Sequence, residues 1–164
     1  ALAVSPVAYA NGWPVLLVGQ NAVPPSVSDV IAATGIDTTV VLGGEAVVSG
    51  GVYTALNADD RWAGSDRYGT AVDIAESAID GGFADADYVG VASGVMFPDA
   101  LSGGPVAGSY GGVMMLTAPD ALPSATAGWL DDNALDIFAV DIYGGTVAVS
   151  NAVRLEILDI VNGL

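Results

Sequence analysis

Short apolar runs bounded by glycine alternate along this chain with segments of helical periodicity. The runs are rich in valine, leucine and isoleucine and have the length of strands that are buried on both faces. The predicted strands are Pro14–Val18, Thr39–Leu42, Tyr88–Ala92, Val113–Thr117 and Ile137–Tyr143.

Helix start signals lie between these runs. Proline, which suits the first turn of a helix, precedes two predicted helices, Ser26–Thr34 and Ser124–Asp132. Ser49 and Ser150 are candidate N-caps for Gly50–Leu56 and Asn151–Val161, and Ser65 or Asp66 can cap a helix that begins at Arg67. The alternation predicts an α/β fold of parallel sheet modules with helices on both faces, in a Rossmann-like or Toprim-like layering, joined by right-handed crossovers.

The chain also repeats itself. "ALAVSPVA" at residues 1–8 matches "ALSGGPVA" at residues 100–107, an offset of 99 (100 − 1). After a shift of two residues, "VLGGEAVVS" at 41–49 falls on "IYGGTVAVS" at 142–150. We therefore predict a tandem repeat, with a partial first copy at 1–58 and a complete second copy at 59–164. The front part of the second copy, Arg61–Asp99, has no counterpart in the first, so we expect either a piece of a longer protein or a copy completed from elsewhere.

The amino-acid composition limits the partners and the kinds of catalysis that are possible for this chain. The chain of 164 residues has a formal net charge of −16, three arginines, no histidine and no cysteine. Most of this exterior therefore repels nucleic acid and anionic membrane surfaces, and histidine- or cysteine-based catalysis is excluded. Two uncharged stretches, Ala1–Ser28 and Ala100–Pro119, are interrupted by proline and glycine, so we expect no membrane insertion. An exterior this acidic indicates a salt-adapted protein, because molar salt screens the repulsion between carboxylates.

The remaining candidate chemistry is that of carboxylates and glycine turns. Acidic pairs at Asp59-Asp60, Asp85/Asp87 and Asp131-Asp132 lack calcium-loop spacing, and we interpret them as solvated turns rather than catalytic or metal sites. We predict no cofactor. The turns Gly43-Gly44 and Gly144-Gly145 follow predicted strands, where backbone N–H groups can hold an anion or simply permit a tight turn.

Two of the three arginines lie in "RWAGSDRYGTAVDIA", residues 61–75. One interpretation is structural, with each guanidinium bracing a turn through carboxylate and backbone oxygens, and with Asp66 or Asp99 as a local acid partner for Arg67. The other is an anion or sugar site, in which Arg61 and Arg67 converge with the rings of Trp62 and Tyr68. The candidate ligand-binding residues are Arg61, Trp62, Asp66, Arg67, Tyr68, Asp99, Gly43, Gly44, Gly144 and Gly145.

Several motifs in order resemble the cell wall binding repeat family, type 2. The first motif is an arginine, a glycine, Asp-Arg-Tyr and Thr-Ala, which here are Arg61, Gly64, Asp66-Arg67-Tyr68 and Thr70-Ala71. The second motif is "MFPDAL" at 96–101, and the third is a proline-led strand at Pro14–Leu17, which departs to Val113–Leu116 in the second copy. The fourth is the Gly-Gly…Val-Ser ending, which occurs twice. The resemblance implies a noncatalytic α/β module outside the cell, at the cell surface or cell wall. It also implies that the module anchors a larger protein to a cell-envelope polysaccharide or polymer. The alternative is a structural module whose partners are neighbouring repeats or further copies, in a surface layer or filament.

Overall fold

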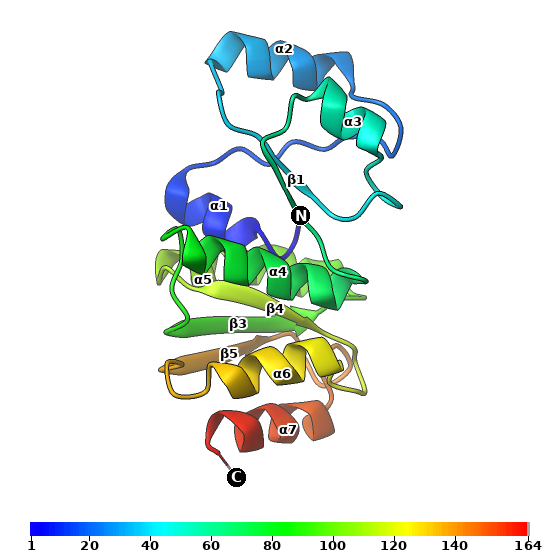
Figure 1. The fold of residues 1–164 in the computed structure, drawn as a ribbon. Helices are drawn as coiled ribbons and strands as arrows, with labels where there is room; N and C mark the ends of the chain where they lie inside the picture. Colours follow the sequence, from blue (N-terminus) through cyan, green and yellow to red (C-terminus); the bar gives the residue numbers. More distant parts are fainter. Residues whose placement is uncertain (164) are drawn as a thin grey trace.

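The computed structural model describes residues 1–163 and contains two parallel sheets with helices packed around them (Figure 1). In the larger sheet, β3 (Tyr88–Ser93) is the central strand, between β4 (Val113–Thr117) and β5 (Ala139–Tyr143). In the smaller sheet, β1 (Val40–Leu42) pairs with β2 (Asp60–Trp62). Every strand pair is parallel, which confirms the predicted α/β class.

The helices have the bounds α1 (Ser5–Asn11), α2 (Pro25–Thr34), α3 (Gly50–Ala55), α4 (Arg67–Asp80), α5 (Phe97–Ser109), α6 (Ser124–Asp132) and α7 (Asn151–Val161). Helices α4 to α7 surround the larger sheet, whereas α2 and α3 lie with β1 at the other end of the molecule (Figure 1). Helix α5 packs on β3, and α4 packs on β4. Helix α6 contacts both α4 and α7 (Figure 1). The second copy is thus a complete layered module.

Local caps explain where several helices begin. The side chain of Asp66 accepts hydrogen bonds at the start of α4, and Ser150 does so at the start of α7, which confirms both predicted caps. Ser49 occupies the N-cap position of α3 but makes no side-chain cap hydrogen bond there.

The core of the second copy lies between its sheet and its helices. All residues of β3 and β4 are buried, as the continuous apolar runs predict for strands covered on both faces. Ile74 from α4, Leu130 from α6 and Ile157 from α7 complete this core, each at most 2% exposed.

The first copy has a different sheet. Pro14–Val18 was predicted as a strand, and this prediction is wrong, because the segment is outside both sheets. By the offset of 99, it corresponds to β4, whose ladder partner is β3. The first copy has no counterpart of β3, so Pro14–Val18 has no neighbour to pair with. Strand β1, which corresponds to the end of β5, pairs instead with β2.

The two copies meet where α1 crosses α5. Helix α1 corresponds by the repeat to the second half of α5, and the two helices pack directly against each other (Figure 1). A Cβ atom on Gly104 would lie 1.8 Å from Oγ of Ser5, and one on Gly108 would lie 2.4 Å from the backbone oxygen of Pro6. The crossing therefore depends on glycine at both positions of α5.

We expect Gly108→Ala to lower the free energy of unfolding by about 1–3 kcal/mol, because the added methyl group must displace the α1 backbone. Gly128→Ala in α6 is the matched control, since a Cβ there meets no atom within 4 Å. That control should gain about 0.5–1 kcal/mol from helix propensity. Urea unfolding measures both values, and a Gly108→Ala chain as stable as the parent would contradict the close crossing.

Candidate functional site

The three arginines make the same kind of contact. Each guanidinium donates a hydrogen bond of 2.5 Å to the carbonyl oxygen of a glycine that follows a strand. Arg61 reaches Gly43 after β1, Arg67 reaches Gly94 after β3, and Arg154 reaches Gly144 after β5. These three arginines are all the cationic side chains of the chain. The scarce positive charge is therefore placed at the carboxyl ends of parallel strands.

Arg67 and Tyr68 lie together at the end of β3. Arg67 is the first residue of α4, and its Nη1 donates to Gly94 rather than to the carboxylates of Asp66 or Asp99. Asp66 instead accepts two backbone N–H bonds of 2.8 Å, from Tyr68 and Gly69, which hold the first turn of α4. A Cβ atom on Gly94 would lie 2.9 Å from Cε1 of Tyr68, so the tyrosine ring covers the same glycine turn.

Asp99 and the second Gly-Gly turn border the same edge of the sheet. Strands β3 and β5 are parallel neighbours, so their carboxyl ends lie side by side, where open α/β sheets commonly place ligands. Gly144 has φ 110°, a backbone conformation that favours glycine. A Cβ atom on Gly144 would also lie 2.5 Å from Oδ2 of Asp99, so only glycine fits beside this carboxylate. Gly145 follows in the same turn, where its carbonyl oxygen accepts backbone N–H bonds from Ala148 and Val149.

Arg61 belongs to the second copy in sequence, but it lies in β2 of the smaller sheet, beside β1 of the first copy. Its guanidinium lies over the ring of Tyr53, with the carbon Cζ 5.3 Å from the ring centroid, in a cation–π arrangement. Its Nη1 contacts Gly43, so Gly43 and Gly44 form the equivalent edge of the first copy. Trp62 is only 6% exposed, and its Nε1 donates to Oδ2 of Asp60 at 3.0 Å. The structure thus places Arg61 and Arg67 at two different turns, with Trp62 buried near the first.

Arg154 was not among the predicted site residues. Its Nη2 donates to Gly144 and its Nε donates to the backbone oxygen of Val149 at 3.0 Å. By the offset of 101 (142 − 41), Arg154 corresponds to Tyr53, so the two copies brace equivalent turns from different elements. This correspondence, read together with the scarcity of arginine, is the sequence signal that could have identified Arg154.

A tyrosine cluster also went unpredicted. The hydroxyl of Tyr88 donates to Oδ2 of Asp141 and lies 2.9 Å from the hydroxyl of Tyr143, and the ring of Tyr88 stacks on Tyr110 with centroids 4.6 Å apart. Burial raises the pKa of Tyr88 and of Tyr143 above the ordinary value, and the hydrogen bond to Asp141 raises the pKa of Tyr88 further. These residues come from separate strands and from the end of a helix, so no short sequence motif predicts that they meet.

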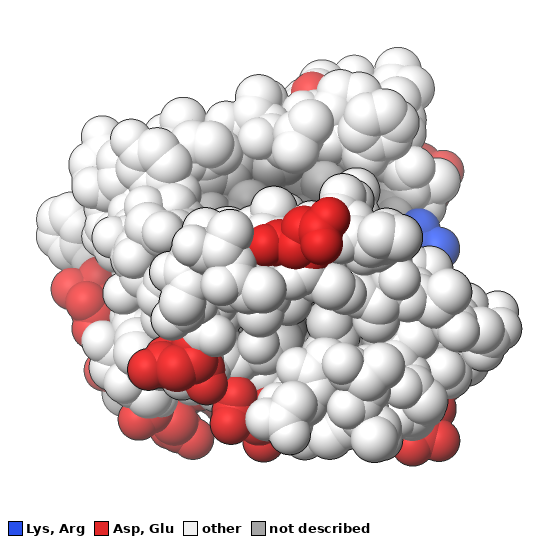
Figure 2. All heavy atoms as spheres, turned by 90° about the horizontal axis from the view of Figure 1, so that it is seen from above, with Lys and Arg blue, Asp and Glu red and all other residues white. Residues whose placement is uncertain are grey.

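Acidic side chains dominate the charged surface. On the face seen in Figure 2, they form separate groups, a basic patch appears at one rim, and mostly uncharged residues border the hollow of this face. Within residues 1–163, no group of three or more His, Cys, Asp or Glu side chains is placed to hold a metal ion. No helix in the same part of the chain is long and apolar enough to cross a membrane.

The sequence matches the family model described as cell wall binding domain 2 over residues 1–53 and 61–154. The chain belongs to this family. It is 30% identical over 163 residues to the N-acetylmuramoyl-L-alanine amidase LytC of Bacillus subtilis (strain 168), covering 99% of this chain and 32% of the relative. It is 26% identical over 162 residues to the amidase enhancer of the same organism, covering 97% of this chain and 21% of the relative.

Two solved structures share the fold. Cwp6 from Clostridium difficile matches with a TM-score of 0.83 and 23% identity over 97% of this chain and 25% of that chain. Cwp8 from the same organism matches with a TM-score of 0.77 and 23% identity over 99% of this chain and 28% of that chain. This cell wall binding domain therefore spans only a minor part of each of these proteins. Family membership places it at the cell surface and cell wall, as the motif resemblance implied.

Proposed function

We propose that this cell wall binding domain is a noncatalytic, extracellular module that anchors a larger protein to a polymer of the cell envelope. The observation that supports the proposal most strongly is the family match, which covers residues in both copies of the repeat. The residue chemistry agrees, because a chain without histidine, cysteine or lysine has few groups for nucleophilic or general-base catalysis.

We place the main polymer contact at the carboxyl ends of β3 and β5. Arg67 is exposed, and its contact with Gly94 uses one of the five N–H donors of the guanidinium, which leaves others for acidic or hydroxyl groups of a polymer. Tyr68 and Asp99 flank it, and the backbone N–H groups of Gly144 and Gly145 lie at the same edge, where their carbonyl oxygens are already hydrogen-bonded.

The equivalent edge of the first copy offers a second, weaker contact. Arg61, Gly43 and Gly44 lie there, although Arg61 is partly covered by its stacking on Tyr53. Asp66 and Trp62 do not contact the polymer in this proposal. They hold the site in place, since Asp66 caps α4 and Trp62 is buried.

Cosedimentation with purified cell envelopes tests the site. We expect Arg67→Ala to weaken apparent binding at least about tenfold, because a hydrogen bond to a charged group contributes about 1.5–3 kcal/mol. Arg67→Lys should recover only part of the loss, because an ammonium group keeps the charge but not the planar fork. Circular dichroism at the assay temperature confirms that each variant is folded.

Ser26→Asp is the control for net charge, since it also makes the chain one unit more negative but lies on the exposed start of α2, in the first copy. Binding by this variant should change less than about twofold, as expected for an exposed charge away from the contact. If Arg67→Ala binds as tightly as the parent chain, the arginine contact is wrong, while binding by the parent chain would still support anchoring.

We also propose that the domain is adapted to high salt. The net charge of −16 makes the folded chain repel itself, and the Debye length falls from about 10 Å at 0.1 M salt to about 3 Å at 1 M. We expect the melting temperature to rise with KCl over this range, and to rise less in sucrose, which stabilises by exclusion without screening. A melting temperature that is flat or falls with KCl would contradict the proposal.

A further inference from the structure

Three tyrosines and one aspartate form a cluster at the β5 edge of the larger sheet. In the strand order β4-β3-β5, strand β5 is at the edge. Asp141 in the middle of β5 is exposed, whereas Tyr88 at the start of β3 is only 8% exposed. The register pairs Asp141 with Gly90, two residues beyond Tyr88, so both side chains lie on the same face of the sheet. The cluster is therefore half buried, with its acidic member at the surface.

Two glycines make room for Tyr143 in this cluster. A Cβ atom on Gly103 of α5 would lie 2.4 Å from Cδ2 of the Tyr143 ring, and one on Gly90 of β3 would lie 2.9 Å from its Cε2. The ring is thus held between the helix and the sheet. Its hydroxyl lies 2.9 Å from the hydroxyl of Tyr88. Packing therefore fixes the position from which Tyr143 contacts Tyr88.

The hydrogen bonds of the cluster leave one acceptor unused at the surface. Tyr88 donates its hydroxyl proton to Oδ2 of Asp141. A phenol has a single O–H donor, so the bond between the two hydroxyls uses the proton of Tyr143. The other oxygen of Asp141, Oδ1, accepts no hydrogen bond from residues 1–163. The cluster thus orients a carboxylate whose second oxygen is free to accept from a ligand.

Tyr110 provides a flat aromatic surface in the same cluster. It is the C-cap residue of α5, and its ring stacks on Tyr88 at an interplanar angle of 16°. Tyr110 is 65% exposed, so the ring face that does not touch Tyr88 is open to a ligand. A second carboxylate lies close by, since a Cβ atom on Gly111 would lie 3.8 Å from Oδ2 of Asp85. The negative ring face and the two carboxylates together favour a cation.

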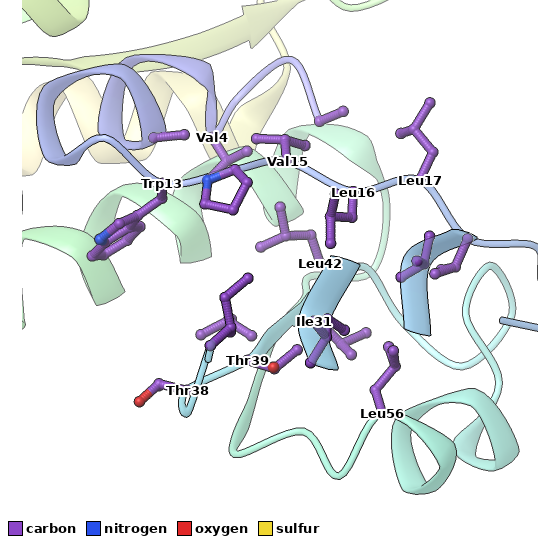
Figure 3. A pocket seen from close by; sticks show the side chains of 18 of the residues that line it. Val4, Trp13, Val15, Leu16, Leu17, Ile31, Thr38, Thr39, Leu42 and Leu56 are labelled. Carbon is purple, nitrogen blue, oxygen red and sulfur yellow. The ribbon is translucent and has the colours of Figure 1, made fainter. Parts of the chain in front are cut away.

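The cluster is a property of the second copy and not of the repeat. By the offset of 101, Asp141 and Tyr143 correspond to Val40 and Leu42 of β1. These two apolar residues border a cavity of about 650 Å³, in which Leu42 lies across the gap from residues 15–17 (Figure 3). A strand at this position therefore forms with apolar side chains. The half-buried polar groups of β5 cost desolvation, and strand formation does not require them.

We propose that Tyr110 and Asp141, held in place by Tyr88 and Tyr143, form a binding site for an aminosugar with a free ammonium group. The apolar face of the sugar ring packs on the exposed face of Tyr110, and the ammonium group donates to Asp141. Acidic sugars are repelled by the carboxylates. The site shares no residue with the arginine edges, so it stands whether or not Arg67 contacts a polymer.

Calorimetric titration with a tetramer of glucosamine, in a buffer that keeps its amino groups protonated, tests the site. We expect Asp141→Asn to weaken binding about tenfold, because it removes a hydrogen bond to a charged group while keeping an acceptor for Tyr88. Tyr110→Ala should weaken binding at least about threefold, whereas Tyr110→Phe should keep it within about twofold, because the ring is retained. Circular dichroism confirms that each variant is folded.

Two control variants remove the same groups elsewhere. Asp29→Asn on the exposed surface of α2 changes the net charge equally, and Tyr9→Ala removes a tyrosine of α1 that is 58% exposed. Both should bind the glucosamine tetramer within about twofold of the parent chain. Arg67→Ala should bind it no more weakly than the parent, which separates this site from the arginine contact.

Two further probes identify the chemistry that is recognised. The N-acetylated tetramer lacks the positive charges, and a lysine peptide of equal charge lacks the sugar ring, so each should bind at least about tenfold more weakly than the glucosamine tetramer. The proposal is overturned if the parent chain does not bind the glucosamine tetramer, or if either probe binds equally well. It is also overturned if Asp141→Asn and Tyr110→Ala bind like the control variants.

Discussion

The close crossing of α1 and α5 is the contact on which the arrangement of the two copies depends. Gly104 and Gly108 let the α1 backbone approach to a distance that any side chain would prevent. The first copy lacks a central strand, so it cannot build the continuous sheet core that stabilises the second. It remains attached and ordered because its first helix belongs to the interface with α5, while β1 gains one ladder with β2.

The parallel sheets determine where the arginines lie. Parallel strands end at a common edge, and their turns leave carbonyl oxygens that need donors. Arg67 and Arg154 meet this need at the ends of the neighbouring strands β3 and β5, and Arg61 meets it at the end of β1 in the smaller sheet. The same residues that stabilise the turns therefore also place positive charge at strand ends. In a chain of net charge −16, the ends of β3 and β5 are where we propose contact with an anionic or hydroxyl-rich polymer. Bracing and binding are therefore compatible roles of one side chain.

The second copy could be predicted closely from the sequence because its local signals agree with its neighbours. The predicted bounds of β4, α6 and α7 match the structure, since each has its packing partners within the same copy. Pro14–Val18 has an equally strong apolar pattern, but a strand also requires a partner that the pattern does not reveal. The separation of Arg61 from Arg67 was hidden for a similar reason, because each side chain reaches a carbonyl many residues away, at Gly43 and Gly94.

Within this chain, the first copy is a partial repeat that packs on the second through α1. Hydrogen exchange of the intact chain compares equivalent segments of the two copies within one molecule. We expect amides of residues 15–18 to exchange orders of magnitude faster than those of residues 114–117, because only the latter lie in a sheet. Amides of α1 in hydrogen-bonded positions should be protected together with those of α5. Equal protection of residues 15–18 and 114–117 would show that the first copy does not depend on the second in this way.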